Sequence, residues 1–280
     1  MKNYDILYTN GCSFTRGDQL PREECWPELL SEKLNLPLID NSRNAQSMGS
    51  ILSKTMADIL DYKDKKILAI IGLTWPDRYS LKFANLLINY TLADATYRGE
   101  RYGYEKVWGR AFSGIKDLRN KEYGKDIRCN ILYDDVYAMV PIDNDPEGGY
   151  IKTIEPVLKP YLTALKNIFE YDDNFLLNEL ISWYENKLHL QNFLKSQKNV
   201  DYKLINFQSP YDLKNRDGKP RSIALNAADT SQSIKYKKEL FKDKNVLWVR
   251  DSLDIDKNTS HPSKEGCITL CNLIYDSINR

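Results

Sequence analysis

Residues 66–72 have the sequence KILAIIG, a continuous apolar run that lies between charged residues and a glycine. Such a run predicts a strand buried on both faces of a parallel sheet, because helices cover both sides of a strand of that kind. Toward the amino terminus, residues 4–9 and 36–40 are two further predicted strands. Helical spacing of apolar residues follows each of the first two strands, once in a segment opened by Pro27 and again over residues 51–60. This alternation of strands and helices predicts an α/β protein with an open sheet.

The same alternation returns near the other end of the chain. There we predict strands over 202–207 and 246–249 and helices over 175–197 and 264–278. A further short helix is predicted near 231–241, between these last two strands. The regular pattern is interrupted before them, where we predict helices over 81–95 and 154–171 and short strands over 127–132 and 136–140. We therefore expect one domain, residues 1–280, with a mostly parallel sheet of about five strands and a long insertion at about 81–200 that is least regular over 96–153.

Composition excludes several classes of protein. The 40 Lys and Arg residues balance 39 Asp and Glu residues, for a net charge of +1, whereas a nucleic-acid binder that neutralises phosphates normally carries a basic surplus. The longest strongly apolar run, residues 67–73, is too short to span a membrane, and the first residues do not form a signal peptide. The two histidines cannot form a poly-His metal site, and the five cysteines lack paired zinc spacing. We expect a cytoplasmic protein with reduced thiols, no metal, no cofactor, and neither nucleic acid nor a membrane as partner.

A serine follows the first predicted strand, in residues 11–17 (GCSFTRG). Carboxyl ends of parallel strands are where ligands bind, and flanking glycines permit the sharp turn that presents Ser13 Oγ and its own N–H to one substrate atom. Taken alone, the segment favours an ordinary strand-to-helix turn with a capping Ser or Thr. Alternating side-chain direction points Cys12 away from Ser13, so we expect Cys12 to be structural.

A base for this serine has two candidates. His261 stands in residues 261–266 (HPSKEG) immediately before the last predicted helix, where Pro262 and an N-capping Ser263 hold the loop-to-helix junction. His189 lies within a helical stretch and is interpreted as structural. A serine that must lose a proton at neutral pH needs a base, and His261 is the better candidate.

These segments resemble the motifs of a known family. Residues 11–15 (GCSFT) look like the first motif of the SGNH (GDSL-type) hydrolase superfamily, in the variant with Cys before the nucleophile that we associate with phage and bacterial members. Residues 261–266 are similar to its final motif. Residues 25–30 (CWPELL) with 40–47 (DNSRNAQS), and residues 70–78 (IIGLTWPDR), resemble the second and third motifs. The resemblance covers roughly residues 4–80 and 200–280.

The resemblance implies a three-layer α/β/α, flavodoxin-like fold that hydrolyses esters by acyl transfer. Ser13 would attack the carbonyl carbon, and His261 would take the hydroxyl proton and return it to the leaving alcohol. The Ser13 N–H, a backbone N–H in the second motif and a side-chain donor in the third would form the oxyanion hole.

The sequence departs from the family pattern near the base. Asn258 occupies the position of the usual Asp three residues before His261. The ring would be oriented by Asp256, which we prefer, by Asp254, or by Asn258 through a neutral hydrogen bond.

Two departures affect the oxyanion hole. The glycine of the second motif is Ala45 in one register and Gly49 in another, and a backbone donor tolerates either. The asparagine of the third motif is Thr74, a shorter donor. Arg78 would substitute for it, bind an anionic group of the substrate, or form a surface ion pair.

The sequence thus predicts a serine esterase that removes acetyl or another small acyl group from a small molecule or glycan. An acyltransferase with the same nucleophile is one alternative. A catalytically weak binding or assembly protein is another, which Asn258 and Thr74 motivate. Aromatic and cationic residues over 97–110 suit a substrate-binding cap, a subunit interface through 96–153, or a packed subdomain.

Overall fold

The structure is a computed structural model of the 280-residue chain, and it describes residues 3–17, 20–43, 46–74, 78–83, 86–92, 128–133, 136–141, 173–207, 244–249, 252–256 and 261–279. The predicted helices over 154–171 and near 231–241 lie outside these residues. The chain divides into two compact units. One contains Met1–Pro76 and Leu177–Arg280, and the other contains Asp77–Leu176.

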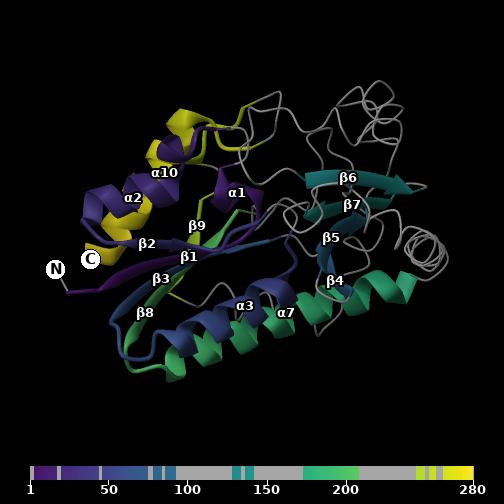
Figure 1. Cartoon of the computed structure of the whole chain (residues 1–280), viewed down its shortest axis with the longest axis horizontal. Helices are drawn as coiled ribbons and strands as arrows, with labels where there is room; N and C mark the ends of the chain where they lie inside the picture. Colours follow the sequence, from purple (N-terminus) through teal and green to yellow (C-terminus); the bar gives the residue numbers. More distant parts are fainter. Residues whose placement is uncertain are drawn as a thin grey trace. The chain divides into compact units, whose positions relative to one another are not determined.

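A five-stranded parallel sheet forms the centre of the first unit (Figure 1). Its order is β2-β1-β3-β8-β9, and its strands are β1 Ile6–Asn10, β2 Leu38–Asp40, β3 Ile67–Leu73, β8 Val200–Asn206 and β9 Val246–Trp248. All five predicted strands of the framework are confirmed. The order is that of flavodoxin-like folds, in which the connections from the two central strands leave in opposite directions.

Helices cover both faces of this sheet. On one face lie α2 (Trp26–Leu34) and α10 (Lys264–Asn279), together with the single turn α1 (Ser13–Arg16) and the 3₁₀ turn Arg22–Glu24. On the other face lie α3 (Met48–Asp61) and α7 (Asp173–Ser196). The predicted α/β/α layering is confirmed, and so are the four predicted helices that correspond to α2, α3, α7 and α10.

The strand that the KILAIIG run predicted is β3, which is buried along its whole length. Alternate side chains enter two separate cores, as strand geometry requires. Ala69 and Ile71 pack with α3 and α7, whereas Leu68 and Ile70 pack with α2 and α10. A strand with helices on both faces has no solvent side, which explains why no polar residue interrupts the run.

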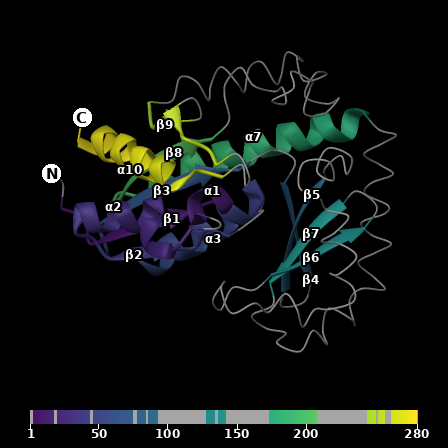
Figure 2. The same cartoon turned by 90° about the horizontal axis from the view of Figure 1, so that it is seen from above.

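The second unit contains a four-stranded antiparallel sheet, best followed in Figure 2. Its order is β4-β5-β7-β6, with β4 Arg78–Phe83, β5 Leu86–Leu92, β6 Arg128–Tyr133 and β7 Val136–Pro141. The strands predicted over 127–132 and 136–140 are confirmed. The helix predicted over 81–95 is wrong, because β4 and β5 occupy that stretch. Its β-branched and aromatic residues, Ile88, Tyr90 and Thr91 among them, favour a pleated strand, and cross-strand pairing overrides the helical spacing of its leucines.

Within the described residues, no helix combines the length and the apolar character needed to cross a membrane.

Candidate active site

Ser13 lies at the carboxyl end of the central strand β1. The chain leaves β1 at Asn10, turns through Gly11 and Cys12, and enters α1 with Ser13 as its first residue. The neighbouring strands β1 and β3 are the two whose connections diverge, and ligands bind at such a switch point. The Ser13 side chain is 3% exposed, so the local fold holds it in place rather than leaving it in solvent.

The structure brings Ser13 and His261 together. Ser13 Oγ and His261 Nε2 are 2.9 Å apart, a hydrogen-bonding distance between residues 248 positions apart in the chain. The Phe14 ring packs against the imidazole, with 5.1 Å between the ring centroids, and it also packs against Phe207. The partly buried imidazole is therefore fixed by both a polar and an aromatic contact.

A short antiparallel pair holds His261 in place. Ile255 pairs with Pro262, the Asp256 N–H donates to the His261 carbonyl oxygen at 2.9 Å, and the Ser263 N–H donates to the Asp254 carbonyl oxygen at 3.0 Å. Residues opposite each other in an antiparallel pair project from the same face. Asp256, our preferred orienting carboxylate, is therefore directly opposite His261 in this pair. That role stays a prediction, and Asn258 lies outside the described residues.

Asp254 is engaged elsewhere. Its Oδ2 accepts a hydrogen bond of 2.6 Å from Ser263 Oγ, which in turn accepts one from the Gly266 N–H. Ser263 is thus the N-cap of α10, as predicted. A Cβ added at Gly266 would overlap the Asp254 carbonyl oxygen, so the glycine allows the first turn of the helix to approach this backbone. Asp254 fixes the helix start next to His261.

The turn before Ser13 leaves a backbone donor available. Asn10 Oδ1 accepts from the Gly11 N–H at 2.8 Å, while no described residue accepts from the Ser13 N–H. An N–H in the first turn of a helix has no partner within the helix. The Ser13 N–H can therefore bind a negatively charged oxygen that forms next to Ser13 Oγ, as the oxyanion hole requires.

The segment of the second motif runs beside this turn. Beyond β2, the Asn41 N–H donates to the Thr9 carbonyl oxygen and the Arg43 N–H to the Gly11 carbonyl oxygen. Ala45, two residues further on, lies outside the described residues. Gly49 is the second residue of α3, two residues after its N-cap Ser47.

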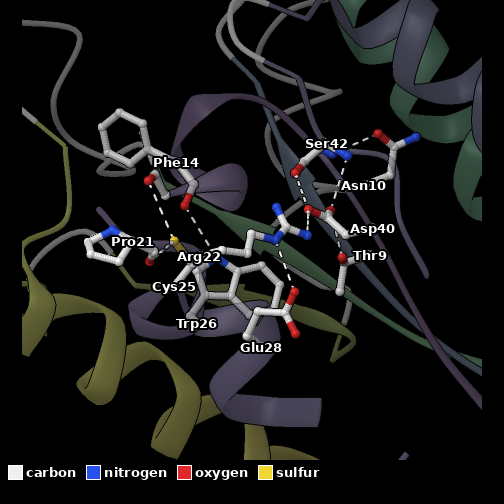
Figure 3. Close-up of polar contacts among 12 residues, drawn as sticks. Thr9, Asn10, Phe14, Pro21, Arg22, Cys25, Trp26, Glu28, Asp40 and Ser42 are labelled. Atoms are coloured by element: carbon white, nitrogen blue, oxygen red, sulfur yellow. Dashed lines mark hydrogen bonds and ion pairs between the residues drawn. The ribbon is translucent and has the colours of Figure 1, made fainter. Parts of the chain in front are cut away.

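A buried carboxylate that the sequence did not single out anchors this segment (Figure 3). The Asp40 side chain is 2% exposed and accepts hydrogen bonds from Thr9 Oγ1 and from the N–H and Oγ of Ser42, at 2.8–3.0 Å. Arg22 Nη2 lies 2.6 Å from Asp40 Oδ2 and supplies the opposite charge. Asp40 thus joins the start of the second motif to β1 and to the turn before α2.

Asp58 also joins the second motif to β1, from the other face of the sheet. Its carboxylate accepts from Tyr8 Oη and Asn41 Nδ2, both at 2.8 Å, and pairs with Lys54. Burial first, and then the charge of Asp58, raise the pKa of Tyr8 well above its usual value. Asp58 falls on the buried face of α3, seven residues after Ile51. A carboxylate on an apolar helix face was therefore the signal that could have identified it.

The third motif is described in part. Thr74 follows β3, is fully buried, and accepts a hydrogen bond of 2.9 Å at its carbonyl oxygen from Trp183 Nε1 of α7. Arg78 begins β4 in the second unit, where its backbone lies opposite Thr91, and its side chain is outside the described part of the chain. Both oxyanion roles assigned to these residues stay predictions.

The thiols near the site are buried. Cys12 is fully buried in the apolar core between the sheet and α2, which fits a structural role. Burial raises the pKa of Cys25 to about 12 and that of Cys267 to about 11, so both are protonated at neutral pH. Among the described residues, no group of three or more His, Cys, Asp or Glu side chains is arranged to hold a metal ion.

Comparisons with known proteins give weak likenesses. No protein-family model matches the sequence, and no curated protein matches it significantly. One similar solved structure is the esterase EstA from Pseudoalteromonas sp., with 12% identity over 98% of this chain and 97% of that chain and a TM-score of 0.39. A second is a putative lipolytic protein of the G-D-S-L family from Desulfitobacterium hafniense DCB-2, with 13% identity over 98% of each chain and a TM-score of 0.42. A third is a carbohydrate acetylesterase family member from Sinorhizobium meliloti, with 8% identity over 99% of this chain and 100% of that chain and a TM-score of 0.41. Such low identities and TM-scores assign no function to this chain.

Proposed function

We propose that the protein is a serine esterase of the SGNH type, with Ser13 as nucleophile and His261 as its base. The observation that carries the proposal is the 2.9 Å contact between Ser13 Oγ and His261 Nε2 at the carboxyl end of β1. A serine hydroxyl is a weak nucleophile until a base takes its proton, and an imidazole at this distance can take it. The resemblance of residues 11–15 and 261–266 to SGNH motifs supports the same assignment.

The reaction proceeds in two half-reactions. Ser13 Oγ attacks the ester carbonyl while its proton passes to His261 Nε2, and the Ser13 N–H stabilises the oxyanion. Collapse breaks the bond to the alcohol, which leaves with the proton from His261, and an acyl group remains on Ser13. Water then attacks this acyl-enzyme, giving its proton to His261, and the acid departs as Ser13 recovers the proton. Asp256, opposite His261 in the short antiparallel pair, is the proposed orienting carboxylate.

The proposed substrate is a small acyl ester, of the acetyl type, on a carbohydrate or another polyhydroxy molecule. Ser13 is only 3% exposed, and a nucleophile this deeply buried favours a small acyl group. The aromatic and cationic residues over 97–110 suit a sugar ring, although they lie outside the described residues.

Labelling with a fluorophosphonate tests the nucleophile. We expect one adduct on the wild type, located on Ser13 by peptide mass spectrometry, none on Ser13→Ala, and an unchanged adduct on Ser53→Ala, which alters an exposed serine of α3. A wild type that takes up no label, or takes it up elsewhere, would overturn the assignment.

A substrate panel then tests the ester class. Acetylated sugars and aryl acetates should be hydrolysed, and activity confined to long-chain lipid esters would contradict the small-acyl proposal. Acyl transfer to an added sugar that is faster than transfer to water would identify an acyltransferase with the same nucleophile.

A further inference from the structure

The Thr15 side chain fills a notch between the ends of the two central strands. A Cβ added at Gly11, just after β1, would overlap Thr15 Oγ1, and so would a Cβ added at Gly72, within β3. In both cases Thr15 Oγ1 is the nearest atom. The hydroxyl oxygen thus occupies the space where the side chain of either residue would begin, and only glycine at both positions admits it.

The Thr15 hydroxyl makes no hydrogen bond to a described residue, although Thr15 is fully buried. A buried polar atom without a partner is unfavourable and therefore needs an explanation. Its size provides one, because an oxygen atom is smaller than a methyl group and enters a notch that a methyl group would overfill. We interpret Oγ1 as a shape-determining atom rather than a hydrogen-bonding one.

The notch acts on the turn that carries Ser13. α1 has only four residues, and a helix this short is not stable without tertiary contacts. Residues two positions apart in a helix project in directions that differ by about 200°. Thr15 therefore faces the sheet while Ser13 faces His261. Trp26 Nε1 also binds the Phe14 carbonyl oxygen at 3.2 Å, but it holds α1 from the α2 side and not from the strands.

We propose that Thr15 is a positioning residue for the nucleophile: its side chain, held in the notch between Gly11 and Gly72, sets the rotation and height of α1 and thereby the distance from Ser13 Oγ to His261 Nε2. The catalytic part of this inference rests on the proposed esterase function. Thr15 acts through Ser13 and touches no reacting atom.

Three substitutions at Thr15 test the role of shape. Thr15→Ala empties the notch, and we expect the rate constant of fluorophosphonate labelling to fall at least about tenfold, since small displacements of reacting groups lower rates by factors of up to a hundred. Thr15→Val overfills the notch and should also lower it. Thr15→Ser keeps the oxygen and should restore labelling to within about threefold of the wild type. Thermal denaturation of each variant separates loss of positioning from loss of the fold.

Compensation at Gly72 gives a sharper test. Gly72→Ala should lower labelling by itself, and adding Thr15→Ala should raise it again, because the new methyl group then takes the space that Oγ1 vacated. The close neighbour that remains is Phe207 Cε2 at 3.0 Å, which is the end of a side chain and can shift. Gly11→Ala is the matched control and should not be rescued. A Cβ there would still lie 2.9 Å from Cβ of residue 15 and 3.0 Å from the Gly72 carbonyl oxygen, at a φ of +157°. If the labelling rate of the Thr15→Ala/Gly72→Ala variant is lowered by the product of the two single-variant factors, the inference is overturned.

The two histidines allow a measurement that does not depend on catalysis. In nitrogen-15 spectra of the imidazoles, Thr15→Ala should move the His261 signals toward those of Ser13→Ala and leave those of the exposed His189 unchanged. If the wild type takes up no label but these signals move, the proposed function fails and the positioning of Ser13 stands. If the wild type is labelled while Thr15→Ala keeps wild-type rates and signals, the inference fails and the proposed function stands.

Discussion

Asp256 and His261 lie opposite each other in a two-stranded pair, and the Asp256 N–H donates a hydrogen bond of 2.9 Å to the His261 carbonyl oxygen. This pair connects the end of the sheet to α10 and determines where the imidazole stands. The same short element holds the proposed base, its preferred carboxylate and the cap of the last helix. Changes in that element should therefore affect both reactivity and stability.

Replacement of the base should distinguish the two histidines. His261→Gln is expected to lower kcat/KM for an aryl acetate by about a hundredfold to ten-thousandfold, the range attributed to general acid–base catalysis. His189→Gln, on the exposed side of α7, should leave kcat/KM within about twofold of the wild type. Equal losses in the two variants would contradict the assignment of His261.

The same substitution at two glycines near helix starts should have opposite effects on stability. Gly49→Ala places a methyl group in α3 where the nearest neighbour, Asn186 Nδ2, is 3.8 Å away, and should raise the free energy of unfolding by about 0.5–1 kcal/mol. Gly266→Ala forces a methyl group against the Asp254 carbonyl oxygen and should lower it by about 1–3 kcal/mol. Urea denaturation measures both, and a stabilised Gly266→Ala variant would show that α10 does not approach the Asp254 backbone.

Two carboxylates that bind Arg22 should contribute unequally. Asp40→Asn removes a buried charge that accepts hydrogen bonds from Thr9 and Ser42, and should lower the free energy of unfolding by about 2–3 kcal/mol. Glu28→Gln removes the partly exposed carboxylate 3.0 Å from Arg22 Nε and should lower it by less than about 1 kcal/mol. Similar values for the two variants would mean that Asp40 is not the anchor of the second motif.

The buried thiols should make the fold sensitive to alkali. Burial raises the pKa of Cys25 to about 12 and of Cys267 to about 11, from an ordinary value of 9.0. The folded state thus holds these protons more tightly than the unfolded state does. Their stabilising contribution is complete below pH 9 and is lost as the pH rises through about 11 to 12.

Thermal denaturation between pH 8 and pH 11 tests this expectation. The melting temperature of the wild type should fall more steeply with pH than that of Cys25→Ala/Cys267→Ala. Tyr8 and Tyr184, whose pKa values burial also raises, titrate alike in both proteins and cancel in the comparison. Parallel curves would show that neither thiol resists ionisation. Iodoacetamide at pH 8 should modify Cys25 and Cys267 only after unfolding.

The strands and helices of the first unit could be predicted from the sequence because their signals are local. The KILAIIG run indicates a doubly covered strand without reference to any other residue, and Ser13 and His261 are each marked by an adjacent turn or helix start. The helix predicted over 81–95 was wrong for the complementary reason: the pairing of Tyr79 with Tyr90 and of Leu81 with Ile88 depends on a partner strand that no local window contains.

The residues that hold the site in place were not identified from the sequence. Asp40, Asp58 and Thr15 act through contacts with segments brought beside them by the parallel sheet. The apolar helix face around Asp58 is a local signal, whereas Asp40 and Thr15 have no distinguishing neighbours in the chain. From the sequence, Gly72 was interpreted as the end of a strand. Its contribution to the notch becomes visible only in the structure, where Thr15 of α1 packs against it.

The sheet order also constrains how the site can be assembled. β1 pairs with β2, which follows it closely in the sequence. β3 pairs with β8, which is synthesised only after the whole insertion, and α10 is synthesised later still. During translation a nascent chain would therefore present Ser13 on a half-built sheet whose histidine is still inside the ribosome. Contacts of such high sequence separation form slowly, and reactivity toward esters should accordingly appear in a single late step of folding rather than gradually as the protein is synthesised.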